Sequence, residues 1–242
     1  MPLVVFVGAH LGYDSQRVPI GGGAAVGHAL VRCWAQTQPF ELLVVGTGPL
    51  PPHPRVPYHR LTVAEDDLLT NFSVRRYARM SREFEREATR LLGHLAQERD
   101  PRDIVVLHND IAEAADFAAL ARLGFRQAAI FHVDVVDYTA QIYLRGKVGA
   151  PRLSRLWRDL ERLKLAALAP DVLKLIFRKQ ELCARYCDLL LVPSSGMAEV
   201  LRASYPWRTE QDVVVVPWGA LVEEEPPGTA AALEELRRRY DP

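Results

Sequence analysis

The sequence predicts an α/β protein with a Rossmann-like, doubly wound and mostly parallel sheet of seven strands. Seven short apolar runs rich in β-branched residues recur along the 242 residues. They are nearly continuous rather than alternating, which is typical of strands buried on both faces. Segments with helical spacing of apolar residues lie between them. Strands that alternate with helices imply right-handed crossovers and a parallel sheet.

The predicted strands and helices follow one another in a regular order. The strands are expected at residues 3–7, 41–45, 56–61, 104–107, 128–132, 188–192 and 213–217. The main helices are expected at 22–37, 72–99, 112–123 and 195–204.

Two segments interrupt this order. Residues 138–187 form a long, mostly helical insertion between the fifth and sixth strands, and residues 222–228 form a linker before a short helix at 230–240. We therefore expect one domain at 1–221, with 222–242 as a linker and the start of a further domain.

Composition excludes several classes of protein. The formal net charge is zero, so the global basic field of a nucleic-acid-binding protein is absent. The three cysteines, Cys33, Cys183 and Cys187, are too few for a disulfide framework and suit a reducing compartment. No neighbouring ligand completes a metal set around Cys183 and Cys187, so we expect buried thiols. No apolar run approaches the ~18 residues of a membrane span. We expect a cytoplasmic protein, soluble or peripheral at a membrane.

Ligands of open α/β sheets bind beyond the carboxyl ends of the strands, so the residues that follow each strand are the candidates for a site. After the first strand, Gly21, Gly22 and Gly23 open the first helix. Glycines at a helix start let backbone N–H groups approach an anion, aided by the helix dipole. The spacing is not that of the dinucleotide fingerprint. The glycines either contact a diphosphate or a sugar, or form a flexible loop.

Histidines next to carboxylates end two further strands. His108 is followed by Asp110 after the fourth strand, and His132 by Asp134 after the fifth. The alternative for each histidine is a hydrogen-bonded core residue. Two histidines at equivalent ends of adjacent strands make a site plausible, and the functional interpretation is favoured for His132 more than for His108. After the sixth strand, Ser194 or Ser195 is expected to cap the next helix.

Residues 151–180 are locally basic, with eight Lys or Arg against three Asp or Glu. Leucines and aromatic residues are interspersed among these charges. Such a stretch either contacts an anionic membrane surface or forms a solvated helical hairpin that covers the sheet.

The order of these pieces resembles the N-terminal domain of GT-B glycosyltransferases, especially the retaining family 4 that includes enzymes similar to glycogen synthase and mannosyltransferases. The matching elements, in chain order, are Pro19 with Gly21–Gly23, His108-Asn109-Asp110, Phe131-His132, Glu181 and Arg185 before the run 188–194, and Val216-Pro217-Trp218-Gly219. Trp218 stands where this family usually has Asn.

The resemblance implies an acceptor-binding half of a GT-B fold, with a nucleotide sugar as donor substrate and no cofactor or metal. The glycines would approach the donor diphosphate or the acceptor, and His132 would bind the transferring sugar or the reacting acceptor. Catalysis would then rest on positioning and on stabilising the departing diphosphate. The donor-binding C-terminal half would be a further domain or a separate subunit. The alternative is a non-catalytic module of the same origin that binds a carbohydrate or a partner. An unrelated Rossmann-like enzyme would need a cofactor fingerprint that the sequence lacks.

Overall fold

The computed structural model describes residues 2–13, 21–63, 72–219 and 228–240. It confirms the predicted fold class, because its seven strands form one sheet in which every pair is parallel. The strand order is β3-β2-β1-β4-β5-β6-β7. The strands are β1 (Leu3–Val7), β2 (Glu41–Gly46), β3 (Tyr58–Arg60), β4 (Ile104–His108), β5 (Arg126–Ile130), β6 (Leu189–Val192) and β7 (Val213–Val215).

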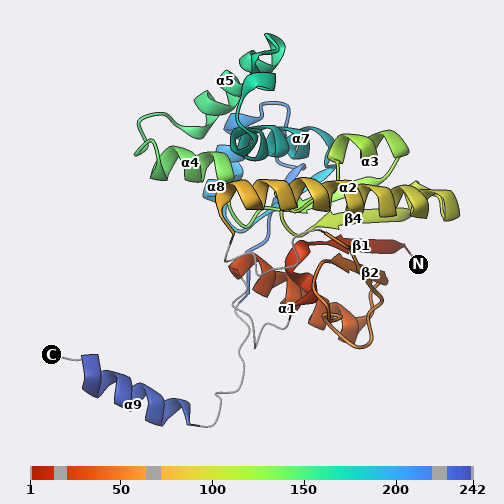
Figure 1. Ribbon diagram of the computed structural model, residues 1–242, viewed down its shortest axis with the longest axis vertical. Helices are drawn as coiled ribbons and strands as arrows, with labels where there is room; N and C mark the ends of the chain where they lie inside the picture. The colour runs from red at the N-terminus through yellow and green to blue at the C-terminus, as the bar shows by residue number, and fades with distance from the viewer. Residues whose placement is uncertain (1, 14–20, 64–71, 220–227, 241–242) are drawn as a thin grey trace.

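Helices connect the strands and cover both faces of the sheet (Figure 1). The main helices are α1 (Gly22–Thr37), α2 (Val74–Glu98), α3 (Phe117–Leu123), α8 (Ser195–Ser204) and α9 (Thr229–Tyr240). The insertion after β5 contains α4 (Val135–Ile142), α5 (Ala150–Arg162), α6 (Asp171–Leu173) and α7 (Lys179–Tyr186), with a 3-10 turn η4 (Leu165–Leu168) and a π-helix η5 (Lys174–Arg178). Two short 3-10 turns, η1 (Ala9–Gly12) and η3 (Pro101–Asp103), flank β1 and β4.

The core lies in two layers, one on each face of the sheet. Side chains alternate along β1, so that Val5 packs beneath α2 while Phe6 packs beneath α1. Both are fully buried, as expected of a strand covered on both sides. Figure 1 shows α1 on one side of the sheet and α2, α3, α7 and α8 on the other.

Helix caps explain where two helices begin. The Ser194 hydroxyl accepts a hydrogen bond from the Met197 N–H at 3.3 Å, which confirms the predicted cap of α8. The predicted start of the third helix at 112 is wrong, because α3 begins at Phe117. Asp116 caps α3 by accepting from the N–H groups of Ala118 and Ala119, each at 3.0 Å. Residues 109–116 consequently form a loop at the end of β4.

The strand order places the reversal point of the doubly wound sheet, where a binding crevice is expected, between β1 and β4. These strands pair from Leu3 with Ile104 to Val7 with His108, while the chain leaves them towards opposite sides of the sheet. A crevice at such a reversal, beyond the carboxyl ends of the strands, is where doubly wound sheets bind their ligands.

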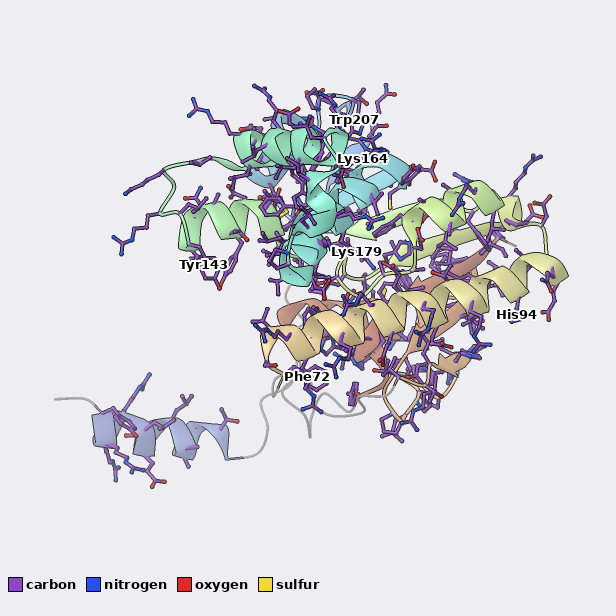
Figure 2. The ribbon with its side chains drawn as sticks, turned by 45° about the horizontal axis from the view of Figure 1, so that its top comes forward. Phe72, His94, Tyr143, Lys164, Lys179 and Trp207 are labelled. Atoms are coloured by element: carbon purple, nitrogen blue, oxygen red, sulfur yellow. The ribbon has the colours of Figure 1, made fainter. Side chains whose placement is uncertain are left out.

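The insertion is anchored to the rest of the domain by buried polar and aromatic contacts. The Arg158 guanidinium pairs with Glu181 of α7 within the insertion at 3.2 Å, and it donates to the Ser204 carbonyl of α8, outside the insertion, at 3.0 Å. It also lies 5.2 Å from the ring of Trp207, which Figure 2 shows beside this helical layer. Part of the basic stretch 151–180 therefore faces the protein interior.

Cys183 and Cys187 are buried with their sulfur atoms 3.7 Å apart, so both are buried free thiols as predicted. None of the helices in the described part of the chain is long and apolar enough to cross a membrane. The predicted linker 222–228 lies, up to residue 227, outside the described residues, and the domain boundary at 221 stays a prediction.

Candidate functional site

A histidine and a glutamate from separate loops meet at the β1–β4 crevice. His10 follows β1 in η1, and Glu113 lies in the loop after β4. The Nδ1 atom of His10 and the Oε2 atom of Glu113 are 2.9 Å apart. The Glu113 side chain is 4% exposed, whereas that of His10 is 26% exposed. The carboxylate is therefore buried and the imidazole can be reached from solvent.

Several groups hold the Glu113 carboxylate in its charged form. The Tyr77 hydroxyl donates to Oε1 at 3.0 Å. The backbone N–H of Ala9 also donates a hydrogen bond to the Glu113 carboxylate. Burial alone would raise the pKa of Glu113, but His10 and these donors together lower it. For His10, burial acts in the other direction and would lower the pKa. The charge and hydrogen bond of Glu113 outweigh burial, so the pKa of His10 is raised from 6.5. The pair thus stabilises a protonated imidazole.

A second carboxyl group, that of Asp110, lies beside this pair. Its Oδ1 atom accepts from the Ala112 N–H at 2.8 Å, which fixes the loop. Burial and the nearby Glu113 charge raise the pKa of Asp110 to about 7. The site therefore holds two carboxyl groups with pKa values that are shifted in opposite directions.

These groups line a cavity of about 270 Å³ together with the start of α1. Its lining residues are His10, Gly21, Gly23, Ala24, Tyr77, Asn109, Asp110 and Glu113. Three of the candidates from the sequence, Gly21, Gly23 and Asp110, thus lie in one cavity. Gly22 is exposed, and a Cβ atom added to it would meet nothing within 4 Å.

His132 lies against the same helix start but lines a neighbouring cavity of about 400 Å³. A Cβ atom on Gly23 would come 2.7 Å from Cδ2 of the His132 ring, so only glycine permits this packing. Asn109 joins the two cavities, because its side chain donates to the Gly23 carbonyl at 3.2 Å and lies 3.4 Å from Nε2 of His132. On another side, the ring centroids of His132 and Trp218 are 5.7 Å apart. Burial lowers the pKa of His132.

His108 and Asp134 have mainly structural contacts. His108 is fully buried, packs edge-on against Phe117 with ring centroids 4.8 Å apart, and lies 3.4 Å from the Gln127 side-chain oxygen. Burial lowers the pKa of His108 to about 3. Asp134 caps α4 and accepts from Gln180 at 2.9 Å, and it also lines the cavity of His132. The structure therefore brings Asp134, but not His108, to a surface that a ligand can reach.

His10, Tyr77 and Glu113 are site residues that the sequence did not single out. His10 comes three positions after β1. Its place just beyond a strand end was the feature of the sequence that could have identified it as a site residue. Glu113 was expected inside the helix 112–123, and Tyr77 lies within the predicted helix 72–99. In the described residues, no group of three or more His, Cys, Asp and Glu could hold a metal ion.

Comparison with known proteins shows similarity in structure but not in sequence. No protein-family model matches the sequence, and no curated protein matches it. Solved structures do match. UGT2 from Phytolacca americana, complexed with UDP-2fluoro-glucose and pterostilbene, has a TM-score of 0.53 at 12% identity, over 97% of this chain and 57% of that one.

Two further structures match to a similar extent. A UDP-glucosyltransferase from Polygonum tinctorium has a TM-score of 0.51 at 13% identity, over 97% of this chain and 56% of that one. A variant of Os79 from O. sativa, in complex with UDP, has a TM-score of 0.51 at 14% identity, over 98% of this chain and 58% of that one. The chain thus spans just over half the length of these structures, and its fold is that of a GT-B glycosyltransferase half. The expected kinship with the retaining family 4 stays a prediction.

Proposed function

We propose that this chain is the acceptor-binding half of a glycosyltransferase that transfers a sugar from a nucleotide sugar to a hydroxyl group. The single observation that carries this proposal is the hydrogen bond between His10 and Glu113 at the β1–β4 crevice. The likeness in fold to proteins that were solved with UDP or a UDP-sugar supports it. The nucleotide would be bound mainly by a second half, which is a further domain or a separate subunit.

The pair has the features of a general base with an orienting carboxylate. Glu113 fixes the tautomer in which Nδ1 of His10 carries a proton, so Nε2 is the nitrogen that takes up another. The acceptor hydroxyl would give its proton to Nε2 while its oxygen bonds to the anomeric carbon and the bond from that carbon to the diphosphate breaks. The buried charge of Glu113 would stabilise the imidazolium that forms.

The stereochemical outcome follows from this chemistry. Base-assisted attack on the face opposite the leaving group inverts the anomeric carbon, whereas the family 4 resemblance implied retention. The His10–Glu113 pair favours inversion. The anomeric configuration of the product, read by NMR, decides between them.

The test is a transfer assay with nucleotide sugars on a protein that contains this chain and a nucleotide-sugar-binding half. His10→Ala should lower kcat by about 10²–10⁴, the usual contribution of a general base. The control is His94→Ala, because His94 is exposed (Figure 2) and lies on α2 about 25 Å along the helix from Tyr77, at roughly 1.5 Å per residue. Full activity of His10→Ala would refute the role of His10. If no nucleotide sugar supports transfer but the chain binds glycans, it is the non-catalytic module.

His132 receives a different role, that of binding the acceptor or the transferring sugar from the neighbouring cavity. His132→Ala should raise KM with a smaller loss in kcat, since a lost binding contact acts on ground and transition states alike. A loss of kcat as large as that of His10→Ala, with KM unchanged, would instead make His132 part of the chemical step.

A further inference from the structure

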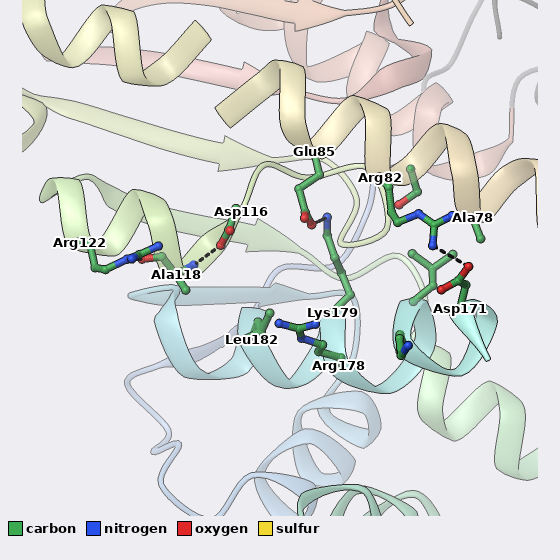
Figure 3. Close-up of a pocket in the computed structure, with 13 residues that line it drawn as sticks. Ala78, Arg82, Glu85, Asp116, Ala118, Arg122, Asp171, Arg178, Lys179 and Leu182 are labelled. Carbon is green, nitrogen blue, oxygen red and sulfur yellow. Dashed lines mark hydrogen bonds and ion pairs between the residues drawn. The ribbon is translucent and has the colours of Figure 1, made fainter. Parts of the chain in front are cut away.

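A third cavity lies on the α2 face of the sheet, and it shares no lining residue with the cavities of His10 and His132. Figure 3 shows it between α2, α3 and the segment 171–182 of the insertion. Its volume is about 330 Å³, which falls within the range of small-molecule sites. Apolar side chains from each element contribute to its walls, namely Ala78, Ala118, Leu175 and Leu182.

The charged side chains around this cavity include more cations than carboxylates. All three carboxylates are already engaged: Asp171 with Arg82 at 2.6 Å, Glu85 with Lys179, and Asp116 with the first N–H groups of α3. Three cations form no ion pair with a carboxylate among the described residues, although Lys174 lies near enough to Asp171 to help lower its pKa. These are Lys174, Arg178 and Arg122, of which Arg122 makes only a hydrogen bond from Nε to the Ala118 carbonyl at 3.3 Å. The cavity thus has an excess of unpaired positive charge.

Two of these cations belong to a rare backbone element. The π-helix Lys174–Arg178 has Lys174 at its start and Arg178 at its end, and both line the cavity. π-helical turns interrupt α-helices mostly as single turns, frequently at functional sites. Arg122 lines the cavity from α3, so cations from two different elements border it.

Buried polar contacts keep the wall of this cavity in place. Lys179 is 6% exposed and donates to Glu85 and, at 2.9 Å, to the Ala114 carbonyl. Figure 2 shows Lys179 where the insertion faces α2. An ammonium group has three donors, and these two bonds use two of them.

We propose that this cavity binds a small phosphate monoester. A phosphate dianion matches two Arg forks and a Lys ammonium, because guanidinium groups form paired hydrogen bonds with phosphate oxygens. The apolar walls accommodate a short carbon skeleton. The site is separate from the proposed sugar-transfer site and does not depend on it. It also accounts for part of the basic stretch 151–180, since Lys174, Arg178 and Lys179 belong to that stretch.

The test is calorimetric titration of the full chain with glycerol 3-phosphate, with glycerol as the neutral comparison. We expect saturable binding of the ester, no binding of glycerol, and an affinity that falls as salt rises. The double variant Lys174→Gln/Arg178→Gln should weaken binding at least about tenfold. Its matched control is Arg155→Gln/Arg162→Gln, which removes the same charge from exposed positions on α5.

The results separate the proposal from general charge attraction. Loss of affinity in the cavity variant alone supports the site. Equal loss in both variants, or no binding of glycerol 3-phosphate up to about 10 mM, where even weak sites fill, would overturn it. Arg178 is exposed, and an unchanged circular dichroism spectrum of the variant would show that the fold is retained.

Discussion

The imidazole of His10 and the carboxylate of Glu113 are 2.9 Å apart although 103 positions separate them in the sequence. Both groups reach this contact because β1 and β4 are neighbours in the sheet and end at the same edge. Tyr77 from α2 adds a third side chain to the same carboxylate. The candidate site is therefore assembled from three segments that lie far apart in the chain.

Glu113→Gln should lower the pKa of His10. Burial lowers the pKa of His10, and the charge and hydrogen bond of Glu113 oppose this effect more strongly than the nearby Asp110 does. An uncharged amide therefore removes the largest opposition to burial. NMR titration of the His10 ring measures this shift without any substrate. Glu98→Gln, an exposed change on α2, should leave the pKa unchanged. An unaltered pKa in Glu113→Gln would mean that the two groups do not interact electrostatically.

Asp110→Asn should stabilise the protein at pH 8 and have little effect near pH 4. In the folded chain the pKa of Asp110 is raised from 3.8 to about 7 by burial and by Glu113. Between these values the folded state binds a proton that the unfolded state has lost, so its stability falls as pH rises through this window. Asn cannot ionise and removes this dependence. Thermal unfolding at several pH values measures the difference, and an equal effect at pH 4 and pH 8 would contradict the prediction.

Gly23→Ala should destabilise the protein by about 1–3 kcal/mol, as overpacking commonly does, and displace the His132 ring. The added Cβ atom would lie 2.7 Å from that ring. Gly22→Ala is the matched control, since its Cβ atom meets nothing and alanine favours the helix. Denaturant unfolding and the NMR signals of His132 report both effects. Equal stability of the two variants would show that the ring does not need the space left by Gly23.

Sedimentation with anionic vesicles tests whether the basic stretch 151–180 contacts a membrane surface. Arg155 and Arg162 are exposed, as is Leu168, whereas Arg158 is held inside by Glu181. If this face contacts lipid, binding should fall as salt rises and weaken in Arg155→Glu/Arg162→Glu. No sedimentation at low salt would establish the alternative, a solvated helical layer.

The sequence by itself determined the fold class, the order of strands and helices, a serine cap at 194 or 195 and the buried thiols Cys183 and Cys187. These follow from local periodicity and from short-range hydrogen bonds, which the chain carries wherever it folds. The sequence also predicted that Gly21, Gly23, Asp110 and His132 lie near one edge of the sheet. These residues follow the carboxyl ends of parallel strands, and those ends all lie at the same edge.

Only the tertiary structure decided which side chains meet. Whether His108 faces the core or the crevice depends on its partners, Phe117 and Gln127, and on the pleat of β4. The pairing of His10 with Glu113 depends on the adjacency of β1 and β4 and on the cap at Asp116, which starts α3 late and leaves Glu113 in a loop. Contacts of this kind arise from the packing of segments that are distant in the sequence. Residue spacing within one segment therefore cannot predict them.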